Sequence, residues 1–266
     1  MSGMLSFWQK APRRWDLAPE IPDGHRVYAV GDVHGQDDLL VDLLGQIEAD
    51  TVARGLAQVT VVFLGDIIDR GPSSAQVVER LRTYRPIGIR MEFLAGNHEE
   101  VLLRILNGEG HLIRDWLRFG GAQCARSYGL SVSSLGKLTV DQVIAKLRAA
   151  IPPEHQAFIA SFADTFRAGD YLFVHAGIRP GVPLSEQSQA DLRWIRGPFL
   201  DHPGRHEAMV VHGHTISMDV DEGIGRIGID TGAYVHGRLT AIALEHDQRW
   251  YLQASRQALA KEGPAR

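Results

Sequence analysis

Between residues 26 and 106 the chain alternates short apolar runs with amphipathic stretches, and this alternation limits its possible folds most strongly. Three of the apolar runs are typical of buried strands, namely residues 26–30, 59–64 and 87–95. Leucines and valines recur at helical spacing after the first two runs, and Ser73 or Ser74 is placed to cap the second helix. A third helix is expected over residues 99–106. This strand–helix order predicts a sheet with helices packed on it.

The pattern changes in the middle of the chain. Residues 111–166 are rich in helical periodicity, contain Gly120 and Gly121, and are interrupted by Pro152-Pro153. They indicate a helical insertion or cap. Further apolar runs follow with little helical pattern between them, at residues 171–176, 208–214, 225–230, 238–244 and 249–254. These runs predict a second, more antiparallel sheet.

We expect a single folded domain over residues 25–255, between an N-terminal arm at 1–24 and a C-terminal tail at 256–266. No internal repeat, low-complexity tract or Gly/Ser linker divides this stretch. The fold class expected is α/β with α+β character. It would consist of two facing mixed sheets flanked by helices, with the insertion at 111–166.

The composition excludes several classes of protein. Lys and Arg number 28 against 32 Asp and Glu, a formal net charge of −4, so we expect no stable binding of nucleic acid through bulk positive charge. One cysteine, Cys124, rules out an internal disulfide framework and a cysteine-rich zinc module. No apolar stretch approaches the about 20 residues of a membrane span, and the N-terminus lacks the pattern of a secretory signal. We therefore expect a cytoplasmic protein, whose oligomeric state is left open.

Polar motifs stand at the carboxyl ends of five predicted strands, where open α/β sheets bind ligands. Taken alone, each Asp, Asn or His in them is most often a turn residue or a satisfied core residue. Turn chemistry gives no reason for the same residue types to recur at one strand end after another. The residues concerned are Asp32 and His34 in GDVHG, Asp66, Asp69 and Arg70 in GDIIDRG, Asn97 and His98 in GNHE, His175 in VHAG, and His212 and His214 in VHGHT.

The potential ligands form a chemically coherent set. It combines carboxylate oxygens, an amide oxygen and imidazole nitrogens, with no thiolate. Such a set suits borderline and hard divalent ions, of which we expect Mn²⁺ first, with Fe²⁺ or Zn²⁺ as alternatives. Two groups of ligands imply two ions. A pair of ions sharing one bridging carboxylate can stabilise both ends of an in-line displacement at phosphorus.

In this order, the motifs GDVHG, GDIIDRG, GNHEE, VHAGIRP and VHGHT resemble the calcineurin-like metallophosphoesterases, and more narrowly the bacterial branch of the PPP serine/threonine phosphatases. The resemblance covers residues 26–254. It implies a four-layer sandwich of two sheets and their helices, and hydrolysis by a water that two metal ions activate. It also implies six metal ligands: Asp32 and His34 at the first ion, Asp66 between both, and Asn97, His175 and His214 at the second.

The same resemblance implies four catalytic residues. His98 would protonate the leaving oxygen, and Asp69 would hold its tautomer and favour its charged form. Arg70 would grip the phosphate, because a planar guanidinium suits phosphate oxygens better than an ammonium group does. Arg196, in the shorter motif RWIRGPF, resembles the second phosphate-binding arginine.

His212 and His214 need separate interpretations, although residues two apart on a strand face the same side. The pattern Gly-His-Thr of the resembled family selects His214 as the ligand. Many metallophosphoesterases outside the PPP branch carry a further histidine two positions later, where this chain has Ile216. We therefore expect His212 to be a core or supporting residue.

The site chemistry leaves the substrate open among three functions. A phosphoprotein phosphatase acting on phospho-Ser or phospho-Thr is our main interpretation, favoured by Asp69 and by GNHEE. A symmetrical dinucleoside tetraphosphate hydrolase or related nucleotide pyrophosphatase is the alternative, favoured by Pro72, HAGIRP and DTGA. An inactive phosphate-binding module is a remote third, because no predicted ligand or acid is substituted. The expected partner is therefore a phosphoprotein, a nucleotide or another phosphorylated small molecule.

Overall fold

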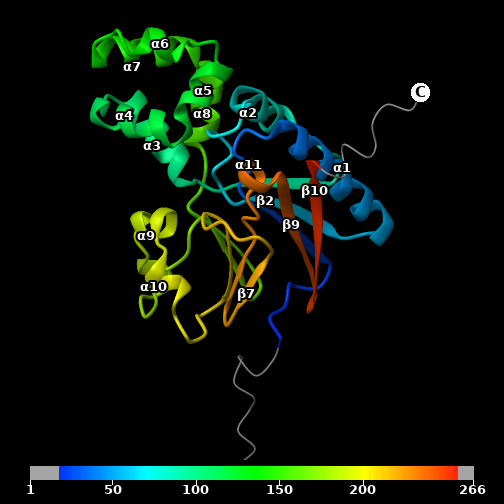
Figure 1. The fold of residues 1–266 in the computed structure, drawn as a ribbon. Coiled ribbons are helices and arrows are strands. Elements are labelled where there is room, and N and C mark those ends of the chain that lie inside the picture. Colours follow the sequence, from blue (N-terminus) through cyan, green and yellow to red (C-terminus); the bar gives the residue numbers. More distant parts are fainter. Residues whose placement is uncertain (1–17, 257–266) are drawn as a thin grey trace, which may run out of the picture.

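The first sheet has five strands in the order β10-β9-β1-β2-β3 (Figure 1). The computed structural model describes residues 18–256, so most of the expected arm and nearly all of the expected tail lie outside it. The strands are β1 (His25–Val30), β2 (Gln58–Phe63), β3 (Ile89–Phe93), β9 (Arg238–Glu245) and β10 (Gln248–Ser255). The first three run parallel, while β9 is antiparallel to β1 and β10 to β9. The alternation at 26–106 thus forms the parallel part of this sheet.

The second sheet also has five strands, in the order β4-β5-β6-β8-β7. They are β4 (Thr165–Ala168), β5 (Tyr171–Val174), β6 (Met209–His212), β7 (Asp221–Gly223) and β8 (Arg226–Gly228). The central strands β5, β6 and β8 are parallel to one another, and the edge strands β4 and β7 pair antiparallel. Both sheets therefore have parallel strands whose carboxyl ends can hold a common site.

The expected sheet membership was wrong in two respects. The runs at 238–244 and 249–254 join the first sheet instead of the second, and the middle of the second sheet is parallel. Apolar periodicity identifies a strand but does not select its neighbours. The parallel pairing of β5 and β6 is possible because the chain between them crosses over through α9 (Gln189–Trp194) and α10 (Gly197–Leu200).

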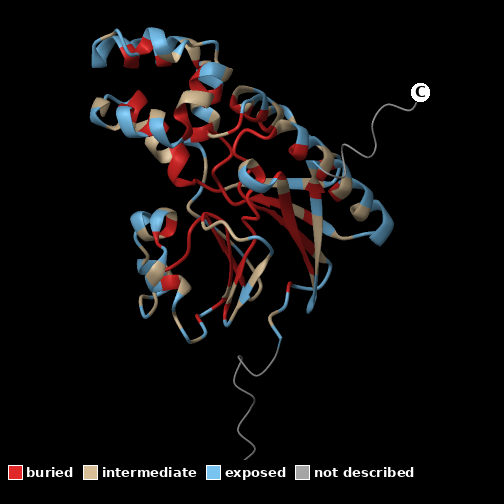
Figure 2. Ribbon diagram, in the orientation of Figure 1, coloured by how far each residue is buried: buried red, intermediate tan, exposed pale blue. Residues whose placement is uncertain are grey.

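Side chains on the two faces of each sheet pack into different apolar cores, of which there are three among the described residues. On β1, Val27 and Ala29 face the second sheet, whereas Tyr28 and Val30 face the helices α1 (Asp37–Arg54), α2 (Ser74–Thr83) and α3 (Asn97–Leu106). On β5, Leu172 and Val174 face α9 and α10 on the outer side of the second sheet. The layers are therefore helix, sheet, sheet and helix, as expected, and Figure 2 shows the buried residues following both sheets.

The residues between α3 and β4 are mainly helical and extend outward above the sheets (Figure 1). They form η2 (Gly110–Leu112), α4 (Ile113–Trp116), the π-helical turn η3 (Leu117–Gly121), α5 (Ala122–Ser127), α6 (Val132–Leu135), α7 (Val140–Ala150) and α8 (Pro153–Ala160). Their apolar side chains, Cys124 and Leu147 among them, share one core with α1 to α3. The last residues of the expected insertion, Thr165 and Phe166, belong instead to strand β4.

The other short helices of the described residues are η4 (Leu184–Glu186) and α11 (Ala233–His236). No helix between residues 18 and 256 has both the length and the apolar character to cross a bilayer. Some local details differ from expectation. Helix α3 begins at Asn97 rather than Glu99, and Ser73 stands at the start of α2 without a capping side-chain bond. The neighbouring Ser74 hydroxyl instead accepts the backbone N–H of Asp69, at 2.9 Å.

Candidate metal centre

Loops that follow parallel strands of both sheets converge on one buried site. The predicted ligands follow β1, β2 and β3 of the first sheet and β5 and β6 of the second. All six predicted metal ligands are at most 8% exposed: Asp32, His34, Asp66, Asn97, His175 and His214. The structure therefore brings together residues that lie up to 182 positions apart, as in the pair Asp32 and His214.

The carboxylate of Asp66 lies at the centre of this site. Its Oδ2 atom is 3.6 Å from Nε2 of His34, 3.5 Å from Nε2 of His175 and 3.8 Å from Nε2 of His98. These spacings are too long for hydrogen bonds. They suit ligand atoms that share an ion at about 2.0–2.2 Å from each.

Two backbone carbonyls fix the orientation of the imidazoles. Nδ1 of His34 lies 2.8 Å from the carbonyl oxygen of Ile68, and Nδ1 of His175 lies 2.8 Å from that of Leu64. A carbonyl only accepts, so each Nδ1 carries the proton and each Nε2 presents a lone pair to the site. Burial lowers the pKa of His34 to about 3 and also lowers that of His175, which keeps both rings neutral.

The second group of predicted ligands fits a cation most clearly. Nε2 of His175 lies 3.0 Å from Oδ1 of Asn97, although both atoms are acceptors. Nδ1 of His214 is 3.2 Å from the same nitrogen, and burial lowers the pKa of His214 to about 2. Two potential triads share Asp66: His34–Asp66–His98 and Asp66–His175–His214. These residues fit a dinuclear metal centre.

Asp32 and Asp230 place more negative charge beside this centre. Both oxygens of Asp32 lie 3.1 Å from the backbone N–H of His214, and one is 4.0 Å from Nε2 of His34. Burial and the neighbouring carboxylates of Asp230 and Asp66 raise the pKa of Asp32. Asp230 is 2% exposed, and its Oδ2 is buried without a hydrogen-bond partner. Adjacent buried carboxylates repel one another, so a bound divalent cation would stabilise all of them.

Backbone strain is concentrated in these loops. Five of the six described non-glycine residues with positive φ are predicted site residues: His34, Asp66, Asp69, Arg70 and His214. Such conformations persist only where the surrounding structure enforces them. Nearby glycines allow the close packing, because a Cβ at Gly96 would come within 2.1 Å of Asp66 Oδ1, and one at Gly213 within 2.0 Å of Asp32 Oδ1. The strained residues and the nearby glycines together fix the orientation of the predicted ligand side chains.

Glu99 holds the loop that carries Asp66, a role that the sequence analysis did not assign. Its carboxylate accepts the backbone N–H groups of Asp66 at 2.8 Å, Ile67 at 2.9 Å and Gly96 at 3.0 Å. Burial, and then the charge of Asp66, raise the pKa of Glu99 to about 8. A glutamate three residues after a glycine at the start of a helix is the sequence signal that points to this contact.

His98 and Asp69 form a hydrogen-bonded pair beside the metal centre. Nδ1 of His98 is 2.7 Å from Asp69 Oδ2, and the indole Nε1–H of Trp116 donates to the same oxygen at 3.0 Å. Burial lowers the pKa of His98, but Asp66 and Asp69 more than offset it and raise that pKa to about 9. The contact with Asp69 places a proton on Nδ1 of His98, and Nε2 faces the residues around Asp66, 3.8 Å from its carboxylate. The sequence placed residues 116–129 at the mouth of the site but did not predict the contact of Trp116 with Asp69.

The two predicted phosphate-binding arginines lie along the same cleft. Arg70 hydrogen-bonds to the hydroxyl of Tyr234, and its guanidinium lies 4.6 Å from that ring's centroid and 3.2 Å from Nε2 of His98. Arg196 reaches the backbone carbonyl of His214, at 3.4 Å. Tyr234 was another residue missed from the sequence. His212, in contrast, packs its ring against Phe199 and joins neither ligand triad.

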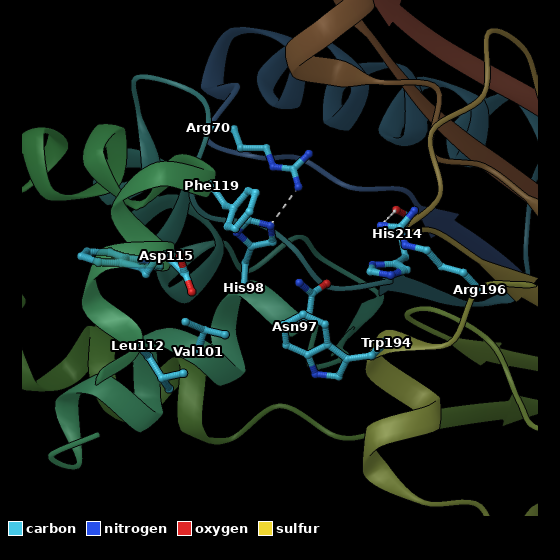
Figure 3. A pocket seen from close by; sticks show the side chains of 11 residues that line it. Arg70, Asn97, His98, Val101, Leu112, Asp115, Phe119, Trp194, Arg196 and His214 are labelled. Atoms are coloured by element: carbon cyan, nitrogen blue, oxygen red, sulfur yellow. Dashed lines mark hydrogen bonds between the residues drawn. The ribbon is translucent and has the colours of Figure 1, made fainter. Parts of the chain in front are cut away.

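A cleft of about 510 Å³ opens beside the metal centre (Figure 3). The helical insertion forms one wall, and the segment that contains α9 forms the opposite wall. Its lining combines arginine, imidazole, amide and carboxylate groups with aromatic and aliphatic side chains. The lining residues are Arg70, Asn97, His98, Val101, Leu112, Asp115, Trp116, Phe119, Trp194, Arg196 and His214.

Comparison with known proteins identifies several relatives. The chain is 28% identical over 260 residues to "Bis(5'-nucleosyl)-tetraphosphatase, symmetrical" of Janthinobacterium sp. (strain Marseille), covering 82% of this chain and 92% of that protein. Among solved structures, a putative diadenosine tetraphosphatase matches with a TM-score of 0.61 and 21% identity, covering 90% of this chain and all of that one. The cold-active protein-tyrosine phosphatase of a psychrophilic Shewanella matches with a TM-score of 0.53 and 20% identity, covering 88% and 83%. Both structures share the fold.

The family follows from the whole domain rather than from one motif. Residues 25–225 match the sequence profile of the calcineurin-like phosphoesterases. This range begins at β1 and includes all six predicted metal ligands. The two triads around Asp66 fit the dinuclear centre that such an enzyme requires. The chain therefore belongs to the calcineurin-like phosphoesterase family and is a metal-dependent phosphoesterase.

Proposed function

We propose that this phosphoesterase hydrolyses dinucleoside polyphosphates, breaking a phosphoanhydride bond by attack of water on phosphorus. The cleft carries the proposal, because its walls combine two arginines with aromatic and aliphatic side chains. A polyphosphate requires the cations, and an attached nucleoside requires apolar walls and a volume of several hundred Å³. The similarity to a symmetrical bis(5'-nucleosyl)-tetraphosphatase supports the same substrate class. The alternative from the sequence thus replaces the protein phosphatase as our main interpretation.

The residues of the site would divide the work as follows. Two divalent ions, Mn²⁺ by preference, would supply Lewis acidity and lower the pKa of water when bound. Their ligands would be Asp32, His34, Asp66, Asn97, His175 and His214. Arg70 and Arg196 would hold phosphoryl oxygens, since both line the cleft. His98 would give its Nε2 proton to the leaving oxygen, while Asp69 holds the opposite ring N–H at 2.7 Å.

A phosphoprotein phosphatase of the PPP type is the second candidate, and the pair His98–Asp69 favours it. A serine alkoxide is a poor leaving group and gains most from a general acid. A nucleoside phosphate leaves more easily, because the second pKa of a phosphate is about 6. A protonated imidazole beside the metal centre is thus more useful for phosphoserine than for an anhydride.

One preparation of the full chain, assayed with Mn²⁺, tests the two candidates against each other. The kcat/KM for diadenosine tetraphosphate should exceed that for a phosphoserine peptide by at least about tenfold, which is about 1.4 kcal/mol of transition-state free energy. Symmetrical cleavage should give ADP as the only nucleotide product, and EDTA should abolish the reaction. A higher value for the phosphopeptide would overturn the proposal in favour of the second candidate. Turnover of neither compound, nor of p-nitrophenyl phosphate, would indicate a phosphate-binding module.

A further inference from the structure

The part of the cleft next to the helical insertion contains an acidic group among apolar ones (Figure 3). We call it the insertion-side subsite and define it as Val101, Leu112, Asp115, Trp116 and Phe119. It lies beside Arg70 and His98, which line the same cleft. A group attached to a phosphate held by Arg70 would therefore enter this subsite. The inference below rests on the proposed function.

Phe119 provides a flat surface at a fixed place in the subsite. Its side chain is 58% exposed, although it lines the cleft. The next residue, Gly120, accepts the backbone N–H of Arg70 at 3.1 Å. Gly120 has a φ of +124°, and a Cβ there would come within 2.5 Å of the Arg70 side chain, so only glycine allows this contact. The contact holds the ring of Phe119 close to Arg70, where a nucleobase could stack on it.

Asp115 supplies the polar group of the subsite. Its side chain points into the cleft (Figure 3). Within residues 18–256 no hydrogen bond or ion pair engages its carboxylate. A carboxylate repels phosphate, so Asp115 would not bind the phosphates that the two arginines hold. It would instead bind a part of the substrate that carries hydrogen-bond donors. Because a carboxylate only accepts, that part must present N–H or O–H groups.

We propose that the insertion-side subsite selects guanine, which stacks on Phe119 and donates to Asp115. The Watson–Crick edge of guanine carries two adjacent donors, N1–H and N2–H, which match the two oxygens of a carboxylate. Adenine presents a donor at N6 beside an acceptor at N1, so it makes one hydrogen bond and places a lone pair against the second oxygen. The subsite thus distinguishes the two purines by the pattern of their edges.

The test compares diguanosine tetraphosphate with diadenosine tetraphosphate. The wild-type chain should show a kcat/KM about tenfold higher for the guanine compound, as expected for one hydrogen bond to a charged group. The Asp115→Asn variant offers one acceptor and one donor, which suits adenine. It should lower the guanine-to-adenine ratio by at least about tenfold. A change in this ratio cannot result from partial unfolding, because unfolding lowers both rates alike.

Matched variants complete the experiment. Asp141→Asn changes an exposed aspartate on α7 that does not line the cleft, and it should leave the ratio unchanged. Phe119→Ala should lower kcat/KM for both compounds by roughly tenfold through lost stacking, and Phe119→Tyr should restore it.

The outcomes separate the subsite from the proposed function. Equal rates for the two purine compounds, with a ratio that Asp115→Asn does not change, would overturn the guanine subsite while the proposed function stands. Hydrolysis of p-nitrophenyl phosphate without hydrolysis of either dinucleotide would overturn the proposed function itself. If Asp115→Asn instead lowers only the hydrolysis of a phosphoserine peptide that contains arginine, the carboxylate binds a peptide cation and the guanine proposal is wrong.

Discussion

The imidazole of His98 lies between a carboxylate that binds its proton and the ligands that surround Asp66. Its Nδ1 is hydrogen-bonded to Asp69, and its Nε2 is 3.8 Å from Asp66. The same nitrogen could therefore protonate a leaving oxygen or act as a third ligand of the triad with His34. The two roles differ in how they depend on the leaving group.

We predict that His98→Asn lowers the hydrolysis rate most for substrates with a poor leaving group. General acid catalysis contributes about 10²–10⁴-fold, so hydrolysis of a phosphoserine peptide should fall by about that factor. Hydrolysis of p-nitrophenyl phosphate should fall much less, and the metal content should stay near that of the wild type. Steady-state kinetics and metal analysis on the same samples check this. His246→Asn, on an exposed turn, is the control. Equal loss on both substrates together with loss of metal would show that His98 is a ligand.

The sequence motifs identified the candidate site residues that lie within them. They did not identify residues that reach the site through contacts between distant parts of the chain. Asp32, Asp66 and His175 each follow an apolar run, so strand periodicity alone placed each of them at the carboxyl end of a strand. Trp116 and Tyr234 stand in helical segments with no such mark. They reach the site only because the chain folds back over 47 and 164 positions, to Asp69 and Arg70. Long-range contacts of this kind leave no local pattern.

At the scale of elements, the helical insertion helps to position Asp69 in the loop after β2. Trp116 ends α4, and its indole donates to Asp69. A Cβ on Gly121 would come within 2.2 Å of that indole, so the π-helical turn packs tightly around it. The insertion therefore supports the pair Asp69–His98 as well as one wall of the cleft.

We predict that Trp116→Phe weakens the acid pair without removing metal. It deletes one hydrogen bond to a carboxylate, an interaction of about 1.5–3 kcal/mol. Hydrolysis of a phosphoserine peptide should fall roughly tenfold more than that of p-nitrophenyl phosphate, with a shifted pH profile. Trp250→Phe is a matched control, because Trp250 donates to Asp50 at 3.1 Å away from the cleft. If both variants behave alike, the Trp116 contact is only structural.

Local sequence patterns predicted the strands and helices better than they predicted which strands pair with one another. The strands at 26–30 and 59–64 and the helices after them follow from buried side chains at regular spacing. The placement of β9 beside β1 does not, because its register depends on packing between the two sheets. The same limit applies to β5 and β6, whose parallel pairing depends on the crossover through α9 and α10.

At the scale of the whole molecule, the predicted metal ligands come from both sheets. Asp66 follows β2 of the first sheet, whereas His175 and His214 follow β5 and β6 of the second. An ion bound between them would hold the two sheets together at their carboxyl ends. Metal binding should therefore stabilise the entire domain and not only the loops.

We predict that Mn²⁺ raises the melting temperature of the metal-free chain. At a metal concentration of about 100 Kd the stabilisation is about 2.7 kcal/mol, provided that the unfolded chain does not bind. For a domain of this size that corresponds to an increase of roughly 5–10 °C. Differential scanning fluorimetry with and without EDTA measures it. An unchanged melting temperature in saturating Mn²⁺ would mean that no ion links the sheets.

The metal content of Asp66→Asn beside that of Asp32→Asn tests the central claim most directly, since both triads found among residues 18–256 share Asp66. After reconstitution with Mn²⁺ and removal of free metal, mass spectrometry of the wild-type chain should find about two ions per chain. Asp32→Asn should retain about one, and Asp66→Asn should retain fewer than Asp32→Asn. Equal metal loss in the two variants, or a wild-type chain that holds no ion, would contradict a dinuclear centre bridged by Asp66.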